Sequence, residues 1–163
     1  SMTKEAVQMN KTTVIKYLEY SREIDDEVKI KRNIVEDLEM CYDTSAAVNY
    51  DGMLRGQNHI SNPTEKAAIN VPDYVRKEIR EHKEDIEQLQ KLKCEIVKEV
   101  LRLSLKQKQV IMMFYFQDLK WAQISDLLHY SERQCKNIRN EAIERLLVIF
   151  QNNKTIRGFR IRE

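Results

Sequence analysis

The sequence predicts an all-α protein, in which a long helical hairpin or coiled-coil arm is followed by a C-terminal helix-turn-helix domain. Three observations favour this fold class. Apolar residues recur at steps of three and four along most of the chain, which is the spacing of one face of a helix. Only three Gly and two Pro interrupt the 163 residues, so long helices are expected. Charged residues make up 33% of the chain, which suits helices with solvated outer faces.

The first predicted helix runs over residues 12–42. Its apolar residues follow helical spacing: Val14, Leu18, Ile24, Val28, Val35, Leu38 and Tyr42. Ser21 and Lys31 interrupt this apolar stripe. A polar insert follows at about residues 43–72, where Gly and Pro break the pattern, and residues 64–69 within it could form one short helix.

The second long helix is predicted to begin near Asp73. Its seam follows a heptad pattern: Ile79, His82, Ile86, Leu89, Lys93, Ile96, Val100 and Leu103. One helix cannot bury so narrow a stripe alone, so the helix is expected to pack against residues 12–42 as an antiparallel hairpin, or against a second copy. The two stripes do not cover each other fully, which predicts a homodimer joined through this arm of residues 1–102. His82 is interpreted as a partly exposed seam residue.

A helix-turn-helix pattern occupies residues 103–152. A short helix begins at Trp121, a break follows at residues 129–131, and Ser131 is a suitable N-cap for the next helix. The first helix is expected to bury Ile124, Leu127 and Leu128. The second is expected to bury one stripe at helical spacing: Cys135, Ile138, Ala142, Leu146 and Ile149.

The outer face of this second helix is rich in polar side chains: Arg133, Gln134, Lys136, Asn137, Arg139 and Asn140. Such side chains contact phosphates and base edges in the major groove of DNA, so this helix is predicted to be a recognition helix. The first four are expected to contact bases or phosphates, with Arg139 and Asn140 behind them. Ser131 caps the helix, whose first backbone amides could also hold a phosphate.

Basic residues outside the recognition helix are expected to add contacts to the DNA backbone. Lys120 directly precedes the first helix of the pair. A basic tail at residues 153–163 supplies four more cations: Lys154, Arg157, Arg160 and Arg162. Residues 103–163 hold 11 Lys and Arg against 6 Asp and Glu, whereas residues 1–102 hold 17 against 20. The basic excess thus lies on the segment with the helix-turn-helix pattern, as phosphate neutralisation requires. Trp121 is expected to pack the domain rather than contact DNA.

The order of one set of residues resembles region 4 of bacterial sigma factors. The set is Leu105, Val110, Tyr115, Trp121, Ile124, Leu128, Ser131, Cys135, Ile138, Ala142 and Leu146. Ser125 stands where a small Ala is usual and His129 where Gly is usual. Both are compatible, because Ser is small and His adopts a left-handed backbone more readily than most residues. The layout of the whole chain is similar to small phage and prophage transcriptional regulators of the ArpU/RinA type.

This resemblance implies a sequence-specific DNA-binding regulator of transcription that activates late phage genes with host RNA polymerase. The expected partners are therefore double-stranded DNA, a second copy of the chain and the host polymerase. Two other functions stay open at this point. One is a protein-interaction module that binds RNA polymerase or another regulator and has weak DNA affinity. The other is a DNA-packaging protein similar to a small terminase subunit.

No motif in the sequence indicates an enzyme, since phosphate-binding and nucleophile motifs are missing, and no cofactor is expected. Cys41, Cys94 and Cys135 each lie at an apolar helical position and are expected to be small buried residues. No His is spaced near them as in a zinc site, so no metal is expected. No apolar run approaches the roughly 20 residues that span a membrane, and the N-terminus is polar. We therefore expect a cytoplasmic location in a bacterial host cell.

Overall fold

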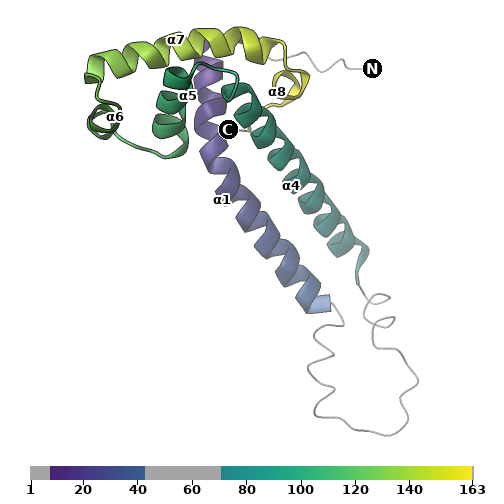
Figure 1. Ribbon diagram of the computed structural model, residues 1–163. Helices are drawn as coiled ribbons and strands as arrows, with labels where there is room; N and C mark the ends of the chain where they lie inside the picture. Colours follow the sequence, from purple (N-terminus) through teal and green to yellow (C-terminus); the bar gives the residue numbers. More distant parts are fainter. Residues whose placement is uncertain (1–7, 43–70, 163) are drawn as a thin grey trace, which may run out of the picture. The chain divides into compact units, whose positions relative to one another are not determined.

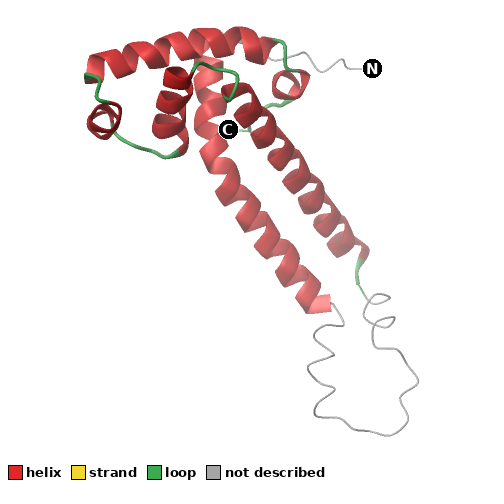
Figure 2. Cartoon of the chain, in the orientation of Figure 1, coloured by secondary structure: helices red, strands yellow, loops and turns green. Residues whose placement is uncertain are grey.

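The computed structural model describes residues 8–42 and 71–162 (Figure 1). In chain order the elements are α1 (Lys11–Tyr42), α4 (Asp73–Val100), α5 (Leu105–Ile111), η1 (Met112–Phe116), α6 (Trp121–Leu128), α7 (Glu132–Gln151) and α8 (Lys154–Gly158). Every regular element in the two described ranges is helical (Figure 2), which confirms the predicted fold class. The short helix predicted at residues 64–69 lies outside the described residues.

The chain divides into two compact units. Residues 1–26 and 89–163 form one unit, here called the helix-turn-helix unit, and residues 27–88 form the other, here called the arm unit. α1 and α4 each contribute one part to each unit.

The core of the helix-turn-helix unit combines helices that are distant in sequence. Its fully buried residues include Val14, Leu18 and Ile24 of α1, Leu92, Ile96 and Val100 of α4, Val110 and Ile111 of α5, and Leu146 and Phe150 of α7. Tyr17 of α1 meets the Phe150 ring edge-on, with ring centroids 6.3 Å apart. Because each such side chain contributes about 1.5–3 kcal/mol when fully buried, this core fixes α7 firmly on the unit.

Ser21 does not interrupt the apolar stripe of α1, so that prediction is wrong. The side chain of Ser21 is fully buried, and its Oγ donates a hydrogen bond of 2.9 Å to the carbonyl oxygen of Tyr17. The hydroxyl is therefore satisfied within its own helix, which lets it enter the core. Tyr17 and Tyr20, which the predicted stripe omitted, are also buried. The buried face of α1 is thus broader than the sequence pattern indicated.

α4 begins at Asp73, as predicted, but one position of its predicted seam is wrong. Leu92 is fully buried, whereas Lys93 lies at the edge of the interface and pairs with Asp25 of α1. Helical steps of three and four residues along α4 are compatible with either Leu92 or Lys93 at this position. Packing against α1 buries the apolar Leu92. Leu103, the last residue of the predicted seam, is buried in the turn that follows the helix.

In the arm unit, α1 and α4 run antiparallel, as the predicted hairpin requires. Lys31 of α1 pairs with Asp85 at 3.4 Å, and Glu39, further along α1, pairs with Lys83, which precedes Asp85 in α4, at 2.8 Å. Lys31 does not break the stripe, because its side chain is 19% exposed and is neutralised by this ion pair. The apolar residues buried here are Val28, Val35 and Val75. His82 is partly buried, as interpreted from the sequence.

Two of the three cysteines are not buried, contrary to the prediction. Cys135 is buried, and burial raises the pKa of its thiol. Cys41 and Cys94 are both exposed. Cys94 lies two residues from both Leu92 and Ile96 on α4, and a step of two places a residue on the opposite side of a helix. The apolar character of cysteine therefore did not indicate its burial.

α5 continues directly into the π-helix η1, which no sequence pattern indicated. The backbone N–H of Gln117 donates to the carbonyl oxygen of Met112 at 2.9 Å and closes the widened turn. Asp118 follows in the left-handed region at φ 55°. This irregular segment turns the chain from α5 toward α6 and buries Tyr115.

Residues 153–162, within the predicted basic tail, pack on the helix-turn-helix unit. The side chain of Asn153 caps α8 by accepting a hydrogen bond of 3.1 Å from the N–H of Ile156, which is fully buried. The hydroxyl of Tyr17 donates a hydrogen bond of 2.5 Å to the carbonyl oxygen of Phe159. Removing this segment would therefore expose part of the core.

Candidate nucleic-acid interface

The turn between α6 and α7 has the geometry expected from the sequence. His129 follows α6 in the left-handed region, at φ 59° and ψ 35°. Ser125 of α6 donates a hydrogen bond from its Oγ to the carbonyl oxygen of Tyr130, which ties the turn to the helix. The two residues that depart from the sigma region 4 pattern therefore both fit this turn.

α7 begins with a side-chain cap, as predicted. The Oγ of Ser131 accepts a hydrogen bond of 3.1 Å from the N–H of Gln134, and its carbonyl oxygen accepts one of 3.0 Å from the N–H of Cys135. A cap of this kind stabilises a helix by about 0.5–2 kcal/mol. It fixes the residue at which α7 begins, and hence the side chains that its first turns present.

Five of the predicted contact residues are exposed on α7: Arg133, Gln134, Lys136, Asn137 and Asn140. The opposite side of the helix buries Cys135, Ile138 and Ala142 against the neighbouring helices α5 and α6. At 3.6 residues per turn, Arg133, Gln134, Asn137 and Asn140 share one face. Lys136 lies to one side of that face, with its ammonium 6.0 Å from the centroid of the Trp121 ring.

Arg139 is held in a different way from the other predicted contact residues. Its guanidinium lies 5.1 Å from the centroid of the Trp121 ring and 5.7 Å from that of Phe114. Its Nε and Nη2 donate hydrogen bonds of 3.3 and 3.2 Å to Oδ1 of Asn140. Burial raises the pKa of the Tyr115 hydroxyl, and Arg139 opposes this effect. Arg139 therefore links α7 to α6 and η1.

The sequence interpretation missed an aromatic cluster beside α7. The ring of Phe114 stacks on Trp121 with centroids 4.2 Å apart, and it meets Tyr115 edge-on at 4.9 Å. Trp121 therefore packs the domain, as expected. The cluster depends on η1, which directs Phe114 toward α6. Its one signal in the sequence was the run of aromatic residues at 114–116.

The remaining predicted contacts lie at two separate places. Lys120 is exposed at the start of α6, where its backbone N–H donates to Oε1 of Gln123 at 2.9 Å. The four basic residues of the predicted tail belong to α8 and the segment after it: Lys154, Arg157, Arg160 and Arg162. α8 follows the end of α7 that is distant from α6 (Figure 1), and helix geometry places about 20 Å between Asn137 and Gln151. The structure thus does not bring the tail together with the recognition face.

The basic side chains of the helix-turn-helix unit differ in whether they have acidic partners. Five of those on α1, α4 and the following turn are paired: Lys11 with Glu144, Arg22 with Asp118, Lys93 with Asp25, Lys98 with Glu95, and Arg102 with Glu99. In the described part of the chain, no carboxylate lies within ion-pair distance of Lys106, Lys120, Arg133 or Lys136. These four unpaired cations lie on or beside α5, α6 and α7, where they could attract phosphates.

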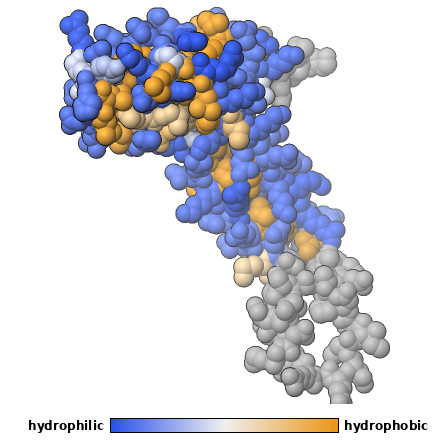
Figure 3. Space-filling model, viewed as in Figure 1, coloured by the Kyte–Doolittle hydropathy of each residue, from blue (hydrophilic) through white to orange (hydrophobic). Residues whose placement is uncertain are grey.

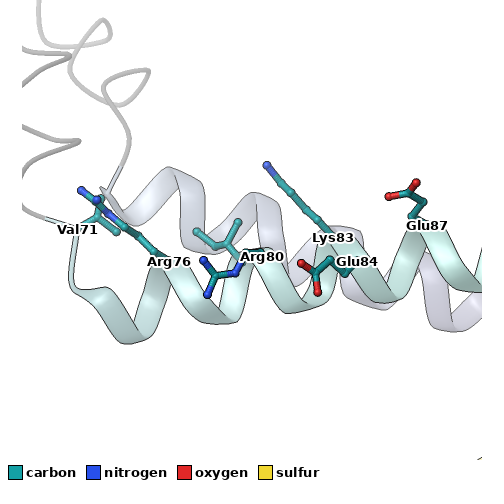
Figure 4. Close-up of a pocket in the computed structure, with 7 residues that line it drawn as sticks. Val71, Arg76, Arg80, Lys83, Glu84 and Glu87 are labelled. Carbon is teal, nitrogen blue, oxygen red and sulfur yellow. The ribbon is translucent and has the colours of Figure 1, made fainter. Parts of the chain in front are cut away.

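The arm unit has an open hollow of about 580 Å³ along α4 (Figure 4). It is lined by Val71, Arg76, Ile79, Arg80, Lys83, Glu84 and Glu87. Its charged side chains are spread along the helix and carry both signs, so we assign it no ligand. Within residues 8–42 and 71–162, no three His, Cys, Asp or Glu side chains are grouped as metal ligands. No helix in those ranges is long and apolar enough to cross a membrane.

Comparison with known proteins agrees with this geometry. Residues 95–146 match the family model for Sigma-70, region 4, which is roughly a third of the chain. The match begins in the last turns of α4 and ends within α7. No curated protein and no solved structure gives a significant match. A region 4 domain is a DNA-binding regulatory domain rather than a catalytic one. Residues 95–146 therefore form a sigma-region-4-like helix-turn-helix domain of the kind found in transcription regulators.

Proposed function

We propose that this protein is a sequence-specific DNA-binding regulator of transcription, in which α7 enters the major groove of double-stranded DNA. One observation carries the proposal: Arg133, Gln134, Asn137 and Asn140 share the exposed face of a helix that is capped at its start and buried along its back. Arg can bind guanine through two hydrogen bonds, and Asn or Gln can bind adenine in the same way. The face therefore offers the chemistry that distinguishes base pairs.

Three other side chains complete the proposed interface. Lys136 and Lys120 are exposed and have no carboxylate partner in the described ranges, so we assign them to backbone phosphates. Arg139 stacks over two aromatic rings, and we assign it chiefly to holding α7 in position. Its loss should therefore lower stability as well as DNA affinity.

We also propose a homodimer that is joined through the arm unit. Several apolar side chains of this unit remain exposed: Ile30 at 60%, Ile34 at 37%, Met40 at 64% and Tyr74 at 72%. The face of the molecule shown in Figure 3 carries apolar patches among hydrophilic residues. A dimer would bury part of this area and present two recognition helices to half-sites about 34 Å apart.

The biological role that we propose is activation of late phage genes together with host RNA polymerase, as in phage and prophage regulators of the ArpU/RinA type. The arrangement of a long helical arm before a sigma-region-4-like domain supports it. The protein would then act in the cytoplasm of the bacterial host, bound to DNA near the polymerase.

Selection of bound duplexes from a random library tests the central proposal. We expect the retained duplexes to share one sequence, arranged as two related half-sites. Retained duplexes without a shared sequence would contradict specific recognition. Binding of RNA polymerase without binding of any duplex would instead indicate a protein-interaction module. A ring-sized oligomer in light scattering would favour a DNA-packaging protein.

Sedimentation of an arm variant tests the homodimer. Ile30→Glu places a charge on an exposed apolar position of α1 and should shift the protein toward the monomer. Gln88→Glu adds the same charge at an exposed position of α4 in the same unit and should leave the mass unchanged. A wild-type protein that sediments as a monomer at tens of micromolar would remove the dimer from the proposal.

A further inference from the structure

Lys106 lies beside the start of α7, although the sequence interpretation did not include it among the contact residues. Its ammonium is 5.3 Å from the centroid of the Tyr130 ring. Tyr130 directly precedes Ser131, which is the N-cap of α7. A cation from α5 is thus placed next to the turn of the helix-turn-helix, on a third helix of the unit.

Both partners of this contact are fixed by local hydrogen bonds. Ser104 and Gln107 form a capping box that defines the first turn of α5, which carries Lys106. The carbonyl oxygen of Tyr130 accepts the hydrogen bond from Ser125 of α6. The backbone of Lys106 and its aromatic partner therefore both have defined positions, and an ammonium over a ring face is attracted to it.

The charge of Lys106 is not neutralised within the described ranges. The side chain is exposed, and no carboxylate there lies within ion-pair distance of its Nζ. Lys11, Lys93 and Lys98 of the same unit are all paired with acidic side chains. Lys106 instead resembles Lys120, since both are unpaired cations close to the helix pair.

We infer that Lys106 contacts a backbone phosphate of the duplex that receives α7, with Tyr130 orienting its ammonium. This inference rests on the proposed function. A phosphate is the partner, rather than a base edge, because Lys106 belongs to α5 and lies off the recognition face. A lysine ammonium is also a compact point charge, which suits a phosphate oxygen without conferring sequence preference.

The salt dependence of DNA binding tests this inference. Each phosphate contact contributes about 0.9 to the slope of log affinity against log salt, so Lys106→Gln should make the slope shallower by about 0.9. The same relation predicts an affinity loss of roughly 8-fold at 0.1 M salt that shrinks to about 2-fold at 0.4 M. The loss should be equal on the selected duplex and on random duplex, because no base is contacted.

Two further variants serve as controls. Lys91→Gln removes the same charge from an exposed position on α4 of the same unit and should leave the slope unchanged. Lys106→Arg keeps the charge and should restore the wild-type slope. Circular dichroism of all variants should match that of the wild type, because both lysines are exposed.

Neutral methylphosphonate groups, placed one at a time in the selected duplex, locate the contact. At one phosphate in each half-site, the neutral substitution should lower the DNA affinity of the wild-type protein. The same substitution should not lower the affinity of Lys106→Gln any further. If the wild type binds DNA and Lys106→Gln keeps its slope and its methylphosphonate profile, the inference is overturned and the proposed function stands. Equal losses in Lys106→Gln and Lys91→Gln also overturn it. A wild type that binds no duplex overturns the proposed function, and the inference with it.

Discussion

The arm unit and the recognition region of the helix-turn-helix unit differ in the ion pairs that their lysines form. In the arm unit Lys31, Lys77 and Lys83 each have a carboxylate oxygen within ion-pair distance, at 3.4, 3.9 and 2.8 Å. Around α5 to α7, Lys106 and Arg133 have no such partner in the described ranges. Paired charge helps to align helices, whereas unpaired charge is available to an external anion. The position of an unpaired cation, as well as the net charge of its segment, therefore decides whether it is available to DNA.

The two units also differ in their cores. The largest fully buried side chains of the described residues all belong to the helix-turn-helix unit: Tyr17, Phe150, Leu18, Ile24, Leu92, Ile96, Ile111, Ile124, Leu146, Ile156, Val14 and Val100. The arm unit buries smaller side chains less completely, with Val28 and Val35 each 6% exposed. The helix-turn-helix unit is thus expected to be the more stable one.

Truncating one core residue in each unit should give the largest effect. Leu146→Ala should lower the free energy of unfolding by about 2–5 kcal/mol, because Leu146 is fully buried and its loss leaves a cavity in the core. Val35→Ala in the arm removes about two methylene equivalents and should cost roughly 1.5 kcal/mol. Urea unfolding followed by circular dichroism measures both changes. Equal losses would show that the arm is packed as tightly as the core.

Removing an unpaired cation should come next in size. Arg133→Ala should weaken binding to the selected duplex by about 1–3 kcal/mol, if its guanidinium contacts a base edge, and should leave helicity unchanged. Arg32→Ala removes the same side chain from an exposed position in the arm unit. It should leave affinity unchanged in the same titration. Similar losses in both variants would show that total charge, not position, sets the affinity.

The cap of α7 should matter for stability to a smaller extent. Ser131→Ala removes the acceptor of the Gln134 N–H and should lower the free energy of unfolding by about 1 kcal/mol. DNA affinity should fall with it, because the first turn of α7 frays. Thr12→Ala, at an exposed position in the first turn of α1, is the matched control. Unchanged stability of Ser131→Ala in thermal unfolding would show that the cap contributes nothing.

Breaking an ion pair of the arm should give the smallest effect. Lys83→Gln removes the ion pair with Glu39. The side chain of Lys83 is 58% exposed and that of Glu39 is 40% exposed. Exposed pairs contribute about 0–1 kcal/mol, so the unfolding midpoint should barely move. The salt dependence of DNA binding should not change at all. A shallower slope in this variant would show that DNA contacts the arm unit as well as the recognition region.

The sequence predicted the helix-turn-helix well, because its signals are local. Ser131 identified the start of α7, and His129 adopts the left-handed backbone that its place in the pattern required. Burial was predicted less well, because it depends on the partner helix. Leu127, expected in the core, is 58% exposed, since α6 is short and buries only the side of Ile124. Phe150 is fully buried but was left out of the predicted stripe.

The candidate interface was predicted only in part for a similar reason. The exposed polar face of α7 follows from helical periodicity alone. The role of Arg139 does not follow from periodicity, because it depends on the rings of Phe114 and Trp121. The π-helix η1 brings these two rings together. Lys106 was missed because its nearest aromatic partner lies 24 positions away along the chain, on the other side of α6. Contacts between separate elements leave no periodic signal in a sequence.

The hydrogen bond from the Tyr17 hydroxyl to the Phe159 carbonyl has a consequence for biosynthesis. These two residues are 142 positions apart, and between them the ribosome makes α4 to α8. Contacts of such long sequence separation form late, since the intervening chain must first be synthesised and its loop closed. Tyr17 and Tyr20 of α1 therefore stay without their aromatic partners Phe150 and Phe159 until α7 and α8 have been made. A chain that stalls before Phe159 therefore lacks the contacts that complete the core beneath α7, and we expect it to be a target for proteolysis rather than a competitor for DNA.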